Sequence, residues 1–592
     1  MNIETFISGA VRRSVEALYG ELGDEQLQIQ KTRKEFEGDY TLVTFPLLRR
    51  SRKSPEATAT EIGEYMTANI AEISAFNVIK GFLNLSLDSR FWAARFAEIV
   101  ADEAFGQAPA TGRTVMVEYS SPNTNKPLHL GHIRNNLLGY SVAQILKANG
   151  HTVLKANLVN DRGIHICKSM LAWKLYGNGE TPASTGMKGD HLVGKYYVEF
   201  VKHYKAQIKE LMAQGQSEED AKKNAPIMRE AQEMLRRWEA RDPEVYGLWE
   251  MMNGWVFAGF AQTYERMGIH FDHTYLESET YLLGKDIVAA GLEKGVFAKR
   301  EDGAVFCDLG KLGKKVVLRS DGTSVYITQD IGTTLKKFED YHPESMVWVV
   351  GDEQNLHFQM LFEIMKRLGY PWADQLYHLS YGMVNLPTGK MKSREGTVVD
   401  ADDLFDEMAK LATDACKERG GEELDPAELA ERGEIIGLGA LKFMLLKFNP
   451  KTTIMFDPAA SLKFEGDTGP YIQYAAARIN SIERKAAERG IDFSSAKVDW
   501  ALLAHPAEKA LAVTAGFYPA VLKLAAERRD CSGLAEYLLN LAKAFNRFYR
   551  ECPVLAAETP ELVAGRLAMA DAVRTIIVDG LATLTIKVPQ AM

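Results

Sequence analysis

The chain has 592 residues, with 79 acidic against 70 basic side chains, a formal net charge of −9 and 46% hydrophobic residues. This composition is that of a folded globular protein and excludes a disordered or fibrous chain. No apolar run approaches the roughly 18 residues of a membrane-spanning helix, and the first residues carry no secretory signal, so we expect neither a membrane partner nor export.

The cysteines also bear on the compartment. The chain has five of them, scattered and nowhere spaced as Cys-x-x-Cys. This pattern argues against a disulfide framework and against a zinc site. We therefore expect a reduced, cytoplasmic protein without zinc, and at about 150 residues per domain the length predicts roughly three to five folding units.

In chain order, residues 1–105 alternate amphipathic helical stretches with short apolar runs at 40–48 and 77–87, a mixed α+β pattern. The Ala-, Gly- and Pro-rich stretch 106–112 is typical of a linker. Residues 114–119 predict a strand, 129–149 a helix that ends at Gly150, and 151–159 a second strand. This order predicts a βαβ unit and therefore a parallel sheet.

The middle of the chain interrupts this sheet. Residues 173–266 are charged and helical, which indicates an insertion. A strand at 345–350, a helix at 356–368 and a strand at 377–384 resume the parallel pattern, and nearly everything after about residue 433 is helical. We expect an N-terminal α+β domain at 1–108, an α/β domain with the insertion at 109–455, and an all-α domain at 456–592.

The most informative stretch is 120–136, SSPNTNKPLHLGHIRNN. His129 and His132, with Gly131 between them, lie where a strand ends and a helix begins, which is where open α/β sheets bind nucleotide phosphates. Imidazoles at such a helix start can donate to phosphate oxygens, and a glycine leaves room for the approach. A bare His-x-x-His is more often a pair of surface histidines or two metal ligands, so this motif needs a wider context.

That context is a resemblance to a known family. HLGH resembles the HIGH signature, and KMKSREG at 390–396 resembles a degenerate KMSKS loop, of class I aminoacyl-tRNA synthetases. More narrowly, 118–134, SVYITQDIG at 324–332, VVGDEQNLHFQ at 349–359 and GPYIQYAAARINSI at 469–482 are similar to arginyl-tRNA synthetases. The resemblance covers essentially the whole chain. It implies a Rossmann-type α/β catalytic domain, an N-terminal α+β domain at the tRNA elbow, and a C-terminal α-helical bundle that binds the anticodon.

The activity that this resemblance implies is that of an arginine–tRNA ligase. Such an enzyme activates L-arginine with ATP and Mg²⁺, releases pyrophosphate, and transfers arginine to the terminal ribose of tRNA(Arg). Charge develops on phosphoryl oxygens, so positioning and cationic donors should supply most of the catalysis. The implied catalytic residues are His129, His132, Lys126 and Lys390, and the ATP contacts also include Gly131, Met391, Lys392 and Arg394.

One position departs from the KMSKS pattern. Ser393 stands where the second lysine of that signature would stand. The resemblance implies that Lys126, just before the histidines, replaces it, with Lys392 and Arg394 as alternatives. Without the resemblance, Lys126 is an ordinary solvated lysine.

Arginine should be recognised by carboxylates, because its guanidinium is planar, always charged and bonded by them in a two-point geometry. The resemblance places Tyr326 and Asp330, one helical turn apart, at the guanidinium, with Gln354 beside them. Taken alone, that pair is a core aromatic and a solvated acid. Asp161 is expected behind the site, and the implied arginine contacts are Glu118, Ser121, Asn123, His129, Tyr326, Asp330, Gln354 and Glu277.

Binding of tRNA needs local basic surface in an acidic chain. Residues 521–550 carry six Lys or Arg against three acids, with Tyr537, Phe545, Phe548 and Tyr549 among them. This mixture suits stacking on bases and contact with phosphates, although aromatics at helical spacing also pack a core. The resemblance implies tRNA contacts by Phe82, Asn84, Tyr474, Arg478, Arg547 and Tyr549.

Three alternatives are weighed against this function. Another class I synthetase is disfavoured by the acid-rich pocket and by the lack of a long editing insertion. A catalytically silent tRNA-binding relative should have lost His129, His132 or Lys390. A nucleotidyltransferase acting on a small cofactor would have no use for two RNA-binding modules. We expect a monomer.

Overall fold

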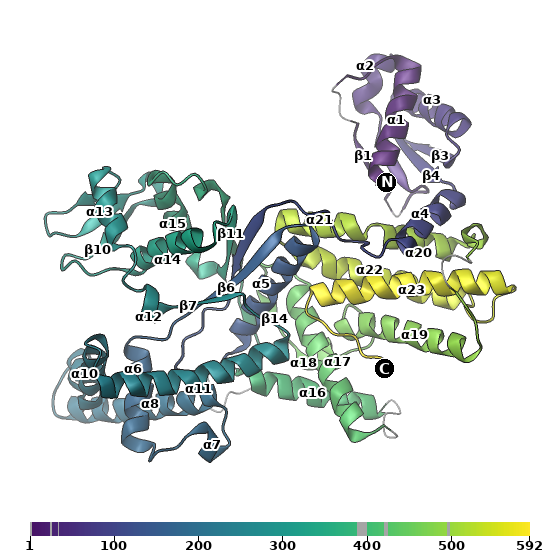
Figure 1. The fold of residues 1–592 in the computed structure, drawn as a ribbon. Coiled ribbons are helices and arrows are strands. Elements are labelled where there is room, and N and C mark those ends of the chain that lie inside the picture. Colours follow the sequence, from purple (N-terminus) through teal and green to yellow (C-terminus); the bar gives the residue numbers. More distant parts are fainter. Residues whose placement is uncertain (1–2, 24–26, 34, 388–398, 419–423, 494–497) are drawn as a thin grey trace. The chain divides into compact units, whose positions relative to one another are not determined.

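A computed structural model describes residues 3–23, 27–33, 35–387, 399–418, 424–493 and 498–592 (Figure 1). The chain divides into two compact units. The first comprises Met1–Phe105, Ile479–Phe517 and Lys543–Ile576, and the second comprises Gly106–Arg478, Tyr518–Ala542 and Ile577–Met592.

The first unit contains a four-stranded antiparallel sheet in the order β1-β2-β4-β3. Its strands are β1 (Ile29–Lys31), β2 (Tyr40–Val43), β3 (Ile73–Ile79) and β4 (Phe82–Leu87), and it packs against α1 (Ile3–Tyr19) and α3 (Pro55–Asn69). The apolar run at 77–87 covers the end of β3 and all of β4. Lys80 and Gly81 join these strands with φ of 48° and 79°, the pair of positive φ values that a two-residue type I′ hairpin needs.

A five-stranded parallel sheet, in the order β12-β11-β5-β6-β7, forms the centre of the second unit. The strands are β5 (Thr114–Glu118), β6 (Thr152–Val159), β7 (His273–Leu276), β11 (Ser345–Gly351) and β12 (Leu376–Tyr381). The crossover helix α5 (Leu130–Ala148) ends before Gly150, whose φ is +80°. The parallel sheet and βαβ unit that the sequence predicts are therefore confirmed.

A second group of elements packs on this sheet through one apolar core. It consists of α13 (Lys285–Glu293), α14 (Tyr326–Tyr341), α15 (Asn355–Arg367) and a small antiparallel sheet of β8 (Ala298–Lys299), β9 (Val305–Asp308) and β10 (Lys314–Leu318). Figure 1 shows β10, α13, α14 and α15 gathered together. The sequence analysis does not predict the antiparallel sheet.

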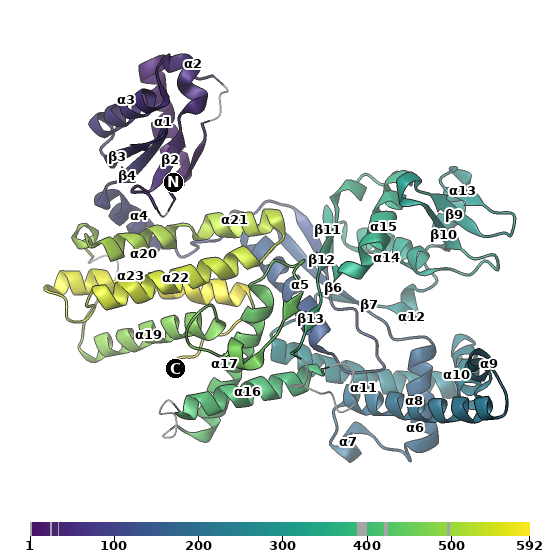
Figure 2. The same cartoon turned by 180° about the vertical axis from the view of Figure 1, so that it is seen from behind.

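The stretch 173–266, where the sequence predicts a helical insertion, is helical in the structure. The helices of this region are α6 (Ile164–Tyr176), α7 (Pro182–Thr185), α8 (Gly189–Ala213), α9 (Glu218–Asn224), α10 (Pro226–Glu239) and α11 (Pro243–Met267), and α12 (Glu277–Thr280) follows after β7. The helices α8 and α11 lie side by side in both views (Figures 1 and 2). Gly259 permits this approach, because a Cβ there would lie 2.3 Å from Asp190 Oδ1.

The last part of the chain is helical, as predicted. After α16 (Ala401–Glu418) and α17 (Pro426–Leu446) come α18 (Pro458–Ser461), α19 (Gly469–Glu488), α20 (Pro506–Gly516), α21 (Tyr518–Arg528), α22 (Ser532–Glu551) and α23 (Pro560–Thr583). A parallel pair of short strands is formed by β13 (Val384–Asn385), before α16, and β14 (Ile454–Met455), between α17 and α18. The domain boundaries expected at 108 and 455 stay predictions.

One apolar stretch is longer than the sequence analysis expects. Among the described residues, Pro506–Arg528 has the length and the mean hydropathy, 1.2, of a membrane-spanning helix, and 33% of that window is buried. This is weak support for a membrane span, because core helices of soluble proteins satisfy the same criteria. Here the stretch is two helices: α20 packs on α4 (Ser89–Ala101) in the first unit, and α21 packs on α5 in the second.

Candidate active site

The two histidines of the HLGH motif build the start of α5. His129 is the N-cap residue, and its Nδ1 accepts a hydrogen bond from the main-chain N–H of Gly131 at 3.2 Å. The Nδ1 of His132 in turn accepts from the main-chain N–H of His129 at 3.1 Å. The ring centroids are 3.8 Å apart. The motif therefore satisfies N–H groups that a helix start leaves unpaired.

These contacts fix how the rings can act. A neutral imidazole whose Nδ1 accepts carries its proton on Nε2, so each ring keeps one N–H to donate. Burial, with a smaller effect of the Lys126 charge, lowers the pKa of His129 to about 4. Burial and the neighbouring His129 and Lys126 hold the pKa of His132 well below its usual value. Both rings are therefore neutral donors at pH 7.

The first turns of α5 are bonded directly to the carboxyl ends of the strands. Asn135 donates to Val349 O of β11 at 2.6 Å, and its Oδ1 accepts from the N–H of Ser120, which follows β5, at 2.7 Å. Arg134 is fully buried and donates to three carbonyl oxygens, those of Gly382, Met383 and Pro450. The helix start is thus held at the sheet edge where α/β proteins bind nucleotides.

Acidic side chains gather at the same edge, after β6 and β7. Asp161 is fully buried, and its carboxylate accepts from the N–H and the hydroxyl of Ser278 at 2.8 and 2.7 Å. Burial and the nearby charges of Asp161 and Asp330 raise the pKa of Glu277, although Arg162 opposes the shift. Arg162 itself lies 3.8 Å from the ring centroid of Tyr281. The acids therefore repel one another in a partly buried place, which a bound cation would relieve.

The predicted guanidinium contacts lie at the start of two helices. Tyr326 begins α14 and is 78% exposed, and Asp330 follows one turn later. His357, in the first turn of α15, bonds Asp330 Oδ2 through Nε2 at 2.6 Å. Gln354 is exposed immediately before α15. His357 is not among the predicted site residues, although it lies in the quoted VVGDEQNLHFQ stretch.

The residues expected to hold the amino acid's backbone groups follow β5. Glu118 is 6% exposed, and its carboxylate forms an ion pair with Lys337, which the sequence analysis does not identify. Ser121 is exposed, and Asn123 is half-buried beside Asn160 in a parallel bridge. The carboxylate of Glu118 therefore already has a cation beside it. Its contact with arginine stays a prediction.

The KMKSREG residues Lys390, Met391, Lys392 and Arg394 lie outside the described part of the chain. The segment immediately after them is described. Leu130 donates to Val399 O at 3.0 Å, Ala401 donates to Leu128 O at 2.9 Å, and His129 pairs with Asp400 in an antiparallel bridge. The segment 399–401 is therefore hydrogen-bonded along the HLGH motif.

Of the predicted tRNA contacts, some are exposed and some are not. Arg547 and Tyr549 on α22 are exposed, and Phe82 and the pair Tyr474 and Arg478 are half-buried. Asn84 is 1% exposed and accepts from Thr41 at 2.6 Å inside the sheet, and its tRNA contact stays a prediction. Of the two readings left open for the aromatics of 521–550, core packing holds for three that are buried: Tyr537, Phe545 and Phe548.

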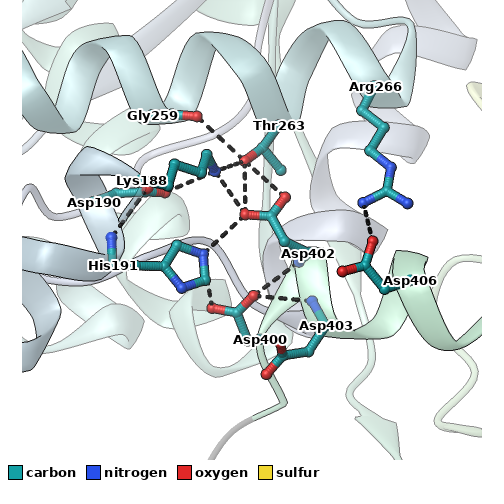
Figure 3. A network of polar contacts seen from close by, with 10 residues as sticks. All are labelled: Lys188, Asp190, His191, Gly259, Thr263, Arg266, Asp400, Asp402, Asp403 and Asp406. Atoms are coloured by element: carbon teal, nitrogen blue, oxygen red, sulfur yellow. Dashed lines mark hydrogen bonds and ion pairs between the residues drawn. The ribbon is translucent and has the colours of Figure 1, made fainter. Parts of the chain in front are cut away.

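One group of the described residues has the donor atoms of a metal site. Ligand atoms of Asp190, His191 and Asp402 lie within 4.8 Å of one another. The ammonium of Lys188, however, bonds Asp190 at 3.1 Å and Asp402 at 2.6 Å (Figure 3). A cation is already supplied by the chain, so this group does not fit a metal ion.

Family models match most of the chain. The model described as tRNA synthetases class I (R), catalytic domain, matches residues 96–457, the DALR anticodon binding domain matches 472–592, and the arginyl tRNA synthetase N terminal domain matches 2–87. The parallel sheet with its His-x-Gly-His crossover helix is thus that of a class I aminoacyl-tRNA synthetase.

Individual relatives narrow the class. The chain is 52% identical to the arginine–tRNA ligase of Bacteroides thetaiotaomicron and 48% identical to that of Flavobacterium psychrophilum, with 100% of each chain covered in both cases. It is similar to the arginyl-tRNA synthetase structure of Thermus thermophilus, with a TM-score of 0.79, 26% identity and 100% of both chains covered. The Plasmodium falciparum enzyme, at 18% identity and a TM-score of 0.76 over 100% of this chain and 99% of that one, shares the fold. The chain belongs to the arginyl-tRNA synthetase family.

Proposed function

We propose that this chain is an arginine–tRNA ligase whose described residues act as follows. In the first step the carboxylate of L-arginine attacks the α-phosphorus of ATP, and pyrophosphate leaves. In the second step a ribose hydroxyl at the end of tRNA(Arg) attacks the arginyl carbonyl, and AMP leaves. The observation that carries the choice of arginine is that Asp161 after β6 and Asp330 on α14 lie close enough to Glu277, after β7, to raise the pKa of its carboxyl group.

The acids Glu277 and Asp330 are the proposed partners of the substrate guanidinium. A guanidinium is always charged, and its planar donors match carboxylates. Its arrival would return Glu277 to the charged form that burial and its acidic neighbours disfavour. Tyr326 on α14, one turn before Asp330, and Gln354, just before α15, would border this group. We assign Asp161 to support, because Ser278 already satisfies its carboxylate.

The neutral histidines are the proposed donors to ATP. Each keeps an Nε2–H after its Nδ1 has accepted a main-chain N–H. Donors of this kind are held in place before the reaction, so they stabilise the charge that develops on phosphoryl oxygens without reorganisation. Lys126 lies close enough to lower the pKa of both rings and is proposed to supply positive charge there. No side chain is required to act as a nucleophile.

The remaining roles rest on the family resemblance. Lys390 is proposed to meet the outer phosphates, with Lys392 and Arg394 as neighbours in the same loop. Arg547, Tyr549, Tyr474, Arg478 and Phe82 are proposed tRNA contacts. Mg²⁺ is proposed to arrive with the ATP phosphates, since it usually keeps waters and few protein ligands. A monomer in the reducing cytoplasm is proposed, and the five free, buried cysteines are consistent with a reduced compartment.

The test is to charge total tRNA with each of the twenty amino acids in turn. Arginine should be accepted best, and Asp330→Asn should raise KM for arginine by about 10- to 100-fold, since a charge-assisted bond is worth about 1.5–3 kcal/mol. The matched control is Asp340→Asn on the same helix, whose carboxylate bonds Tyr275 and Lys336 instead. Another amino acid as the best substrate, or an equal effect of both variants, would reject the assignment.

A further inference from the structure

A network of charged side chains joins the helical insertion to the segment that pairs with His129 (Figure 3). Lys188 is the N-cap residue of α8, and its ammonium bonds Asp190, Asp402 and the hydroxyl of Thr263 on α11. His191, in the first turn of α8, bonds Asp402 Oδ2 through Nε2 at 3.0 Å. One carboxylate, that of Asp402, is therefore held by two side chains from one end of α8 and by Thr263.

Asp402 belongs to the first turn of α16, and the start of this helix is held by Asp400. Asp400 Oδ1 accepts from the N–H groups of Asp402 and Asp403 at 2.8 and 3.2 Å, which is a helix-capping arrangement. The other oxygen, Oδ2, lies 3.7 Å from His191 Nε2. Asp400 and Asp402 thus both face the same imidazole.

The same segment is the one that runs along the HLGH motif. The Val399 carbonyl accepts from Leu130, the Ala401 N–H donates to Leu128, and Asp400 between them pairs with His129. The helix α8 also approaches this motif from a second direction, because a Cβ on Gly194 would lie 3.0 Å from Pro127 Cδ. The position of His129 is therefore coupled to the first turn of α8 through short, direct contacts.

We propose that Lys188 and His191 are positioning residues for His129, acting through Asp402 and Asp400. Neither is among the residues assigned above to ATP or arginine. Their part is to hold the segment 399–402 against the HLGH motif, so that the His129 ring stays aligned as a donor. This role rests on the proposed function in that His129 is assigned to ATP.

The charge balance makes the contribution of His191 depend on pH. Three acids, Asp190, Asp400 and Asp402, face Lys188 and His191. Burial opposes the charged imidazole, but the hydrogen bond to Asp402 and the charges of Asp400 and Asp190 outweigh it, so the pKa of His191 is raised. The bonds from His191 and Lys188 lower the pKa of Asp402 to about 2, although burial acts against them.

Other charged groups lie around the same imidazole. They line a cavity of about 670 Å³ together with His191 and Asp402: Lys195 and Glu199 on α8, Arg266 on α11, and Asp403 and Asp406 on α16. Arg266 pairs with Asp406 at 2.7 Å. Since a raised pKa means that the folded chain holds the proton more tightly, the contact is strongest below the usual histidine pKa. The contact between His191 and Asp402 weakens as the pH rises through the raised pKa of His191.

The first test uses amide hydrogen exchange on the free, full-length chain, which does not depend on catalysis. Between pH 6.5 and 9, the protection factors of the Leu130 and Ala401 amides should fall severalfold in the wild type. His191→Gln, which keeps a donor but cannot titrate, should show lower protection at pH 6.5 and no further fall. His203→Gln is the matched control, because this histidine lies on the same helix and pairs with Glu199.

The second test measures the Kd of ATP by equilibrium dialysis at pH 7.5 and 9. The Kd should rise at least threefold in the wild type and in His203→Gln but stay level in His191→Gln. Wild-type pH dependence in His191→Gln, in either measurement, would overturn the proposal. Failure of the chain to charge tRNA with arginine would reject the proposed function instead and would leave the exchange result interpretable.

Discussion

Lys337 and Glu118 form an ion pair in which the ammonium side chain is 2% exposed and the carboxylate side chain is 7% exposed. Glu118 ends β5, and Lys337 lies on α14, which also carries Asp330. The pair therefore joins the central strand of the sheet to the helix that presents the proposed arginine contact. Two buried charges stabilise a fold only when they are well paired, and each becomes a liability without the other.

Replacing Lys337 by methionine should therefore destabilise the second unit by about 3–5 kcal/mol, because Glu118 would be left charged and buried. The measurement is urea unfolding followed by far-ultraviolet circular dichroism. Lys336→Met is the control, since its exposed pair with Asp340 is worth under about 1 kcal/mol. The double variant Glu118→Gln, Lys337→Met should recover part of the loss. Equal midpoints for both lysine variants would contradict the prediction.

Arginine binding should weaken in acid. The pKa of Glu277 is raised by burial and by Asp161 and Asp330. A protonated carboxyl cannot pair with a guanidinium, so KM for arginine should rise as the pH falls through that raised pKa. Glu277→Gln should have a higher KM that changes little between pH 5.5 and 8. Glu279→Gln, an exposed neighbour on α12, should keep the wild-type profile. A flat wild-type profile would speak against Glu277 as a contact.

Lys126→Ala should lower arginine-dependent pyrophosphate exchange at least tenfold while leaving the fold intact. The physical reason is the loss of a positive charge that both histidines already sense. Lys147→Ala, at the exposed far end of α5, removes the same charge and should have no such effect. Unchanged pyrophosphate exchange in Lys126→Ala would instead assign the role of the second KMSKS lysine to Lys392 or Arg394.

Lys442 should make stability depend on pH in the alkaline range. It is buried on α17 and donates to Met267 O and Thr585 O at 2.7 Å each, and burial lowers its pKa to about 7. The unfolded chain, with a lysine pKa near 10.4, binds more protons above pH 7, so unfolding becomes less favourable as the pH rises. Relative to Lys442→Met, the free energy of unfolding of the wild type should increase by about 2 kcal/mol between pH 7.5 and 9. Parallel urea midpoints for the two proteins would refute this.

Tyr549 should contribute to tRNA binding by stacking. It is 41% exposed, whereas Phe545 and Phe548 on the same helix are fully buried. Stacking on one base is worth about 1–3 kcal/mol, so Tyr549→Ala should raise KM for tRNA by about 5- to 100-fold without changing KM for arginine. Tyr549→Phe keeps the ring and should behave nearly as the wild type. An unchanged KM in the alanine variant would show that the ring does not meet RNA.

The elements that could be predicted from the sequence are those whose pattern is local. β11 is a nearly continuous apolar run and the α5 region ends before Gly150, and both match the structure within a residue or two. The sheet β8-β9-β10 was not predictable in this way, because its strands are two to five residues long and alternate with lysines and glycines. Its burial depends on α14 and α15, which lie later in the chain.

The candidate site shows the same limit. The histidines, Asp330 and Glu277 were identified through motifs, but their partners were not. Lys337 has the pattern of an ordinary helix lysine, and only the fold brings it to Glu118. His357 is likewise brought to Asp330 only by the fold. The burial of Asn84 was not predictable either, since an asparagine in a strand gives no local signal of whether its face is covered.

The start of α5 sets a limit on what can replace its first histidine. An imidazole is rigid and has an acceptor on one side and, when neutral, a donor on the other. Asparagine at position 129 would keep the cap through its Oδ1 but would lose the distant N–H, and glutamine would reach outward but cap poorly. The same ring thus caps the helix and carries the N–H that is proposed to donate to ATP. A substitution of His129 removes the helix cap together with the proposed contact to ATP. The two effects can be separated only when the hydrogen-exchange protection of the α5 amides and the affinity for ATP are both measured.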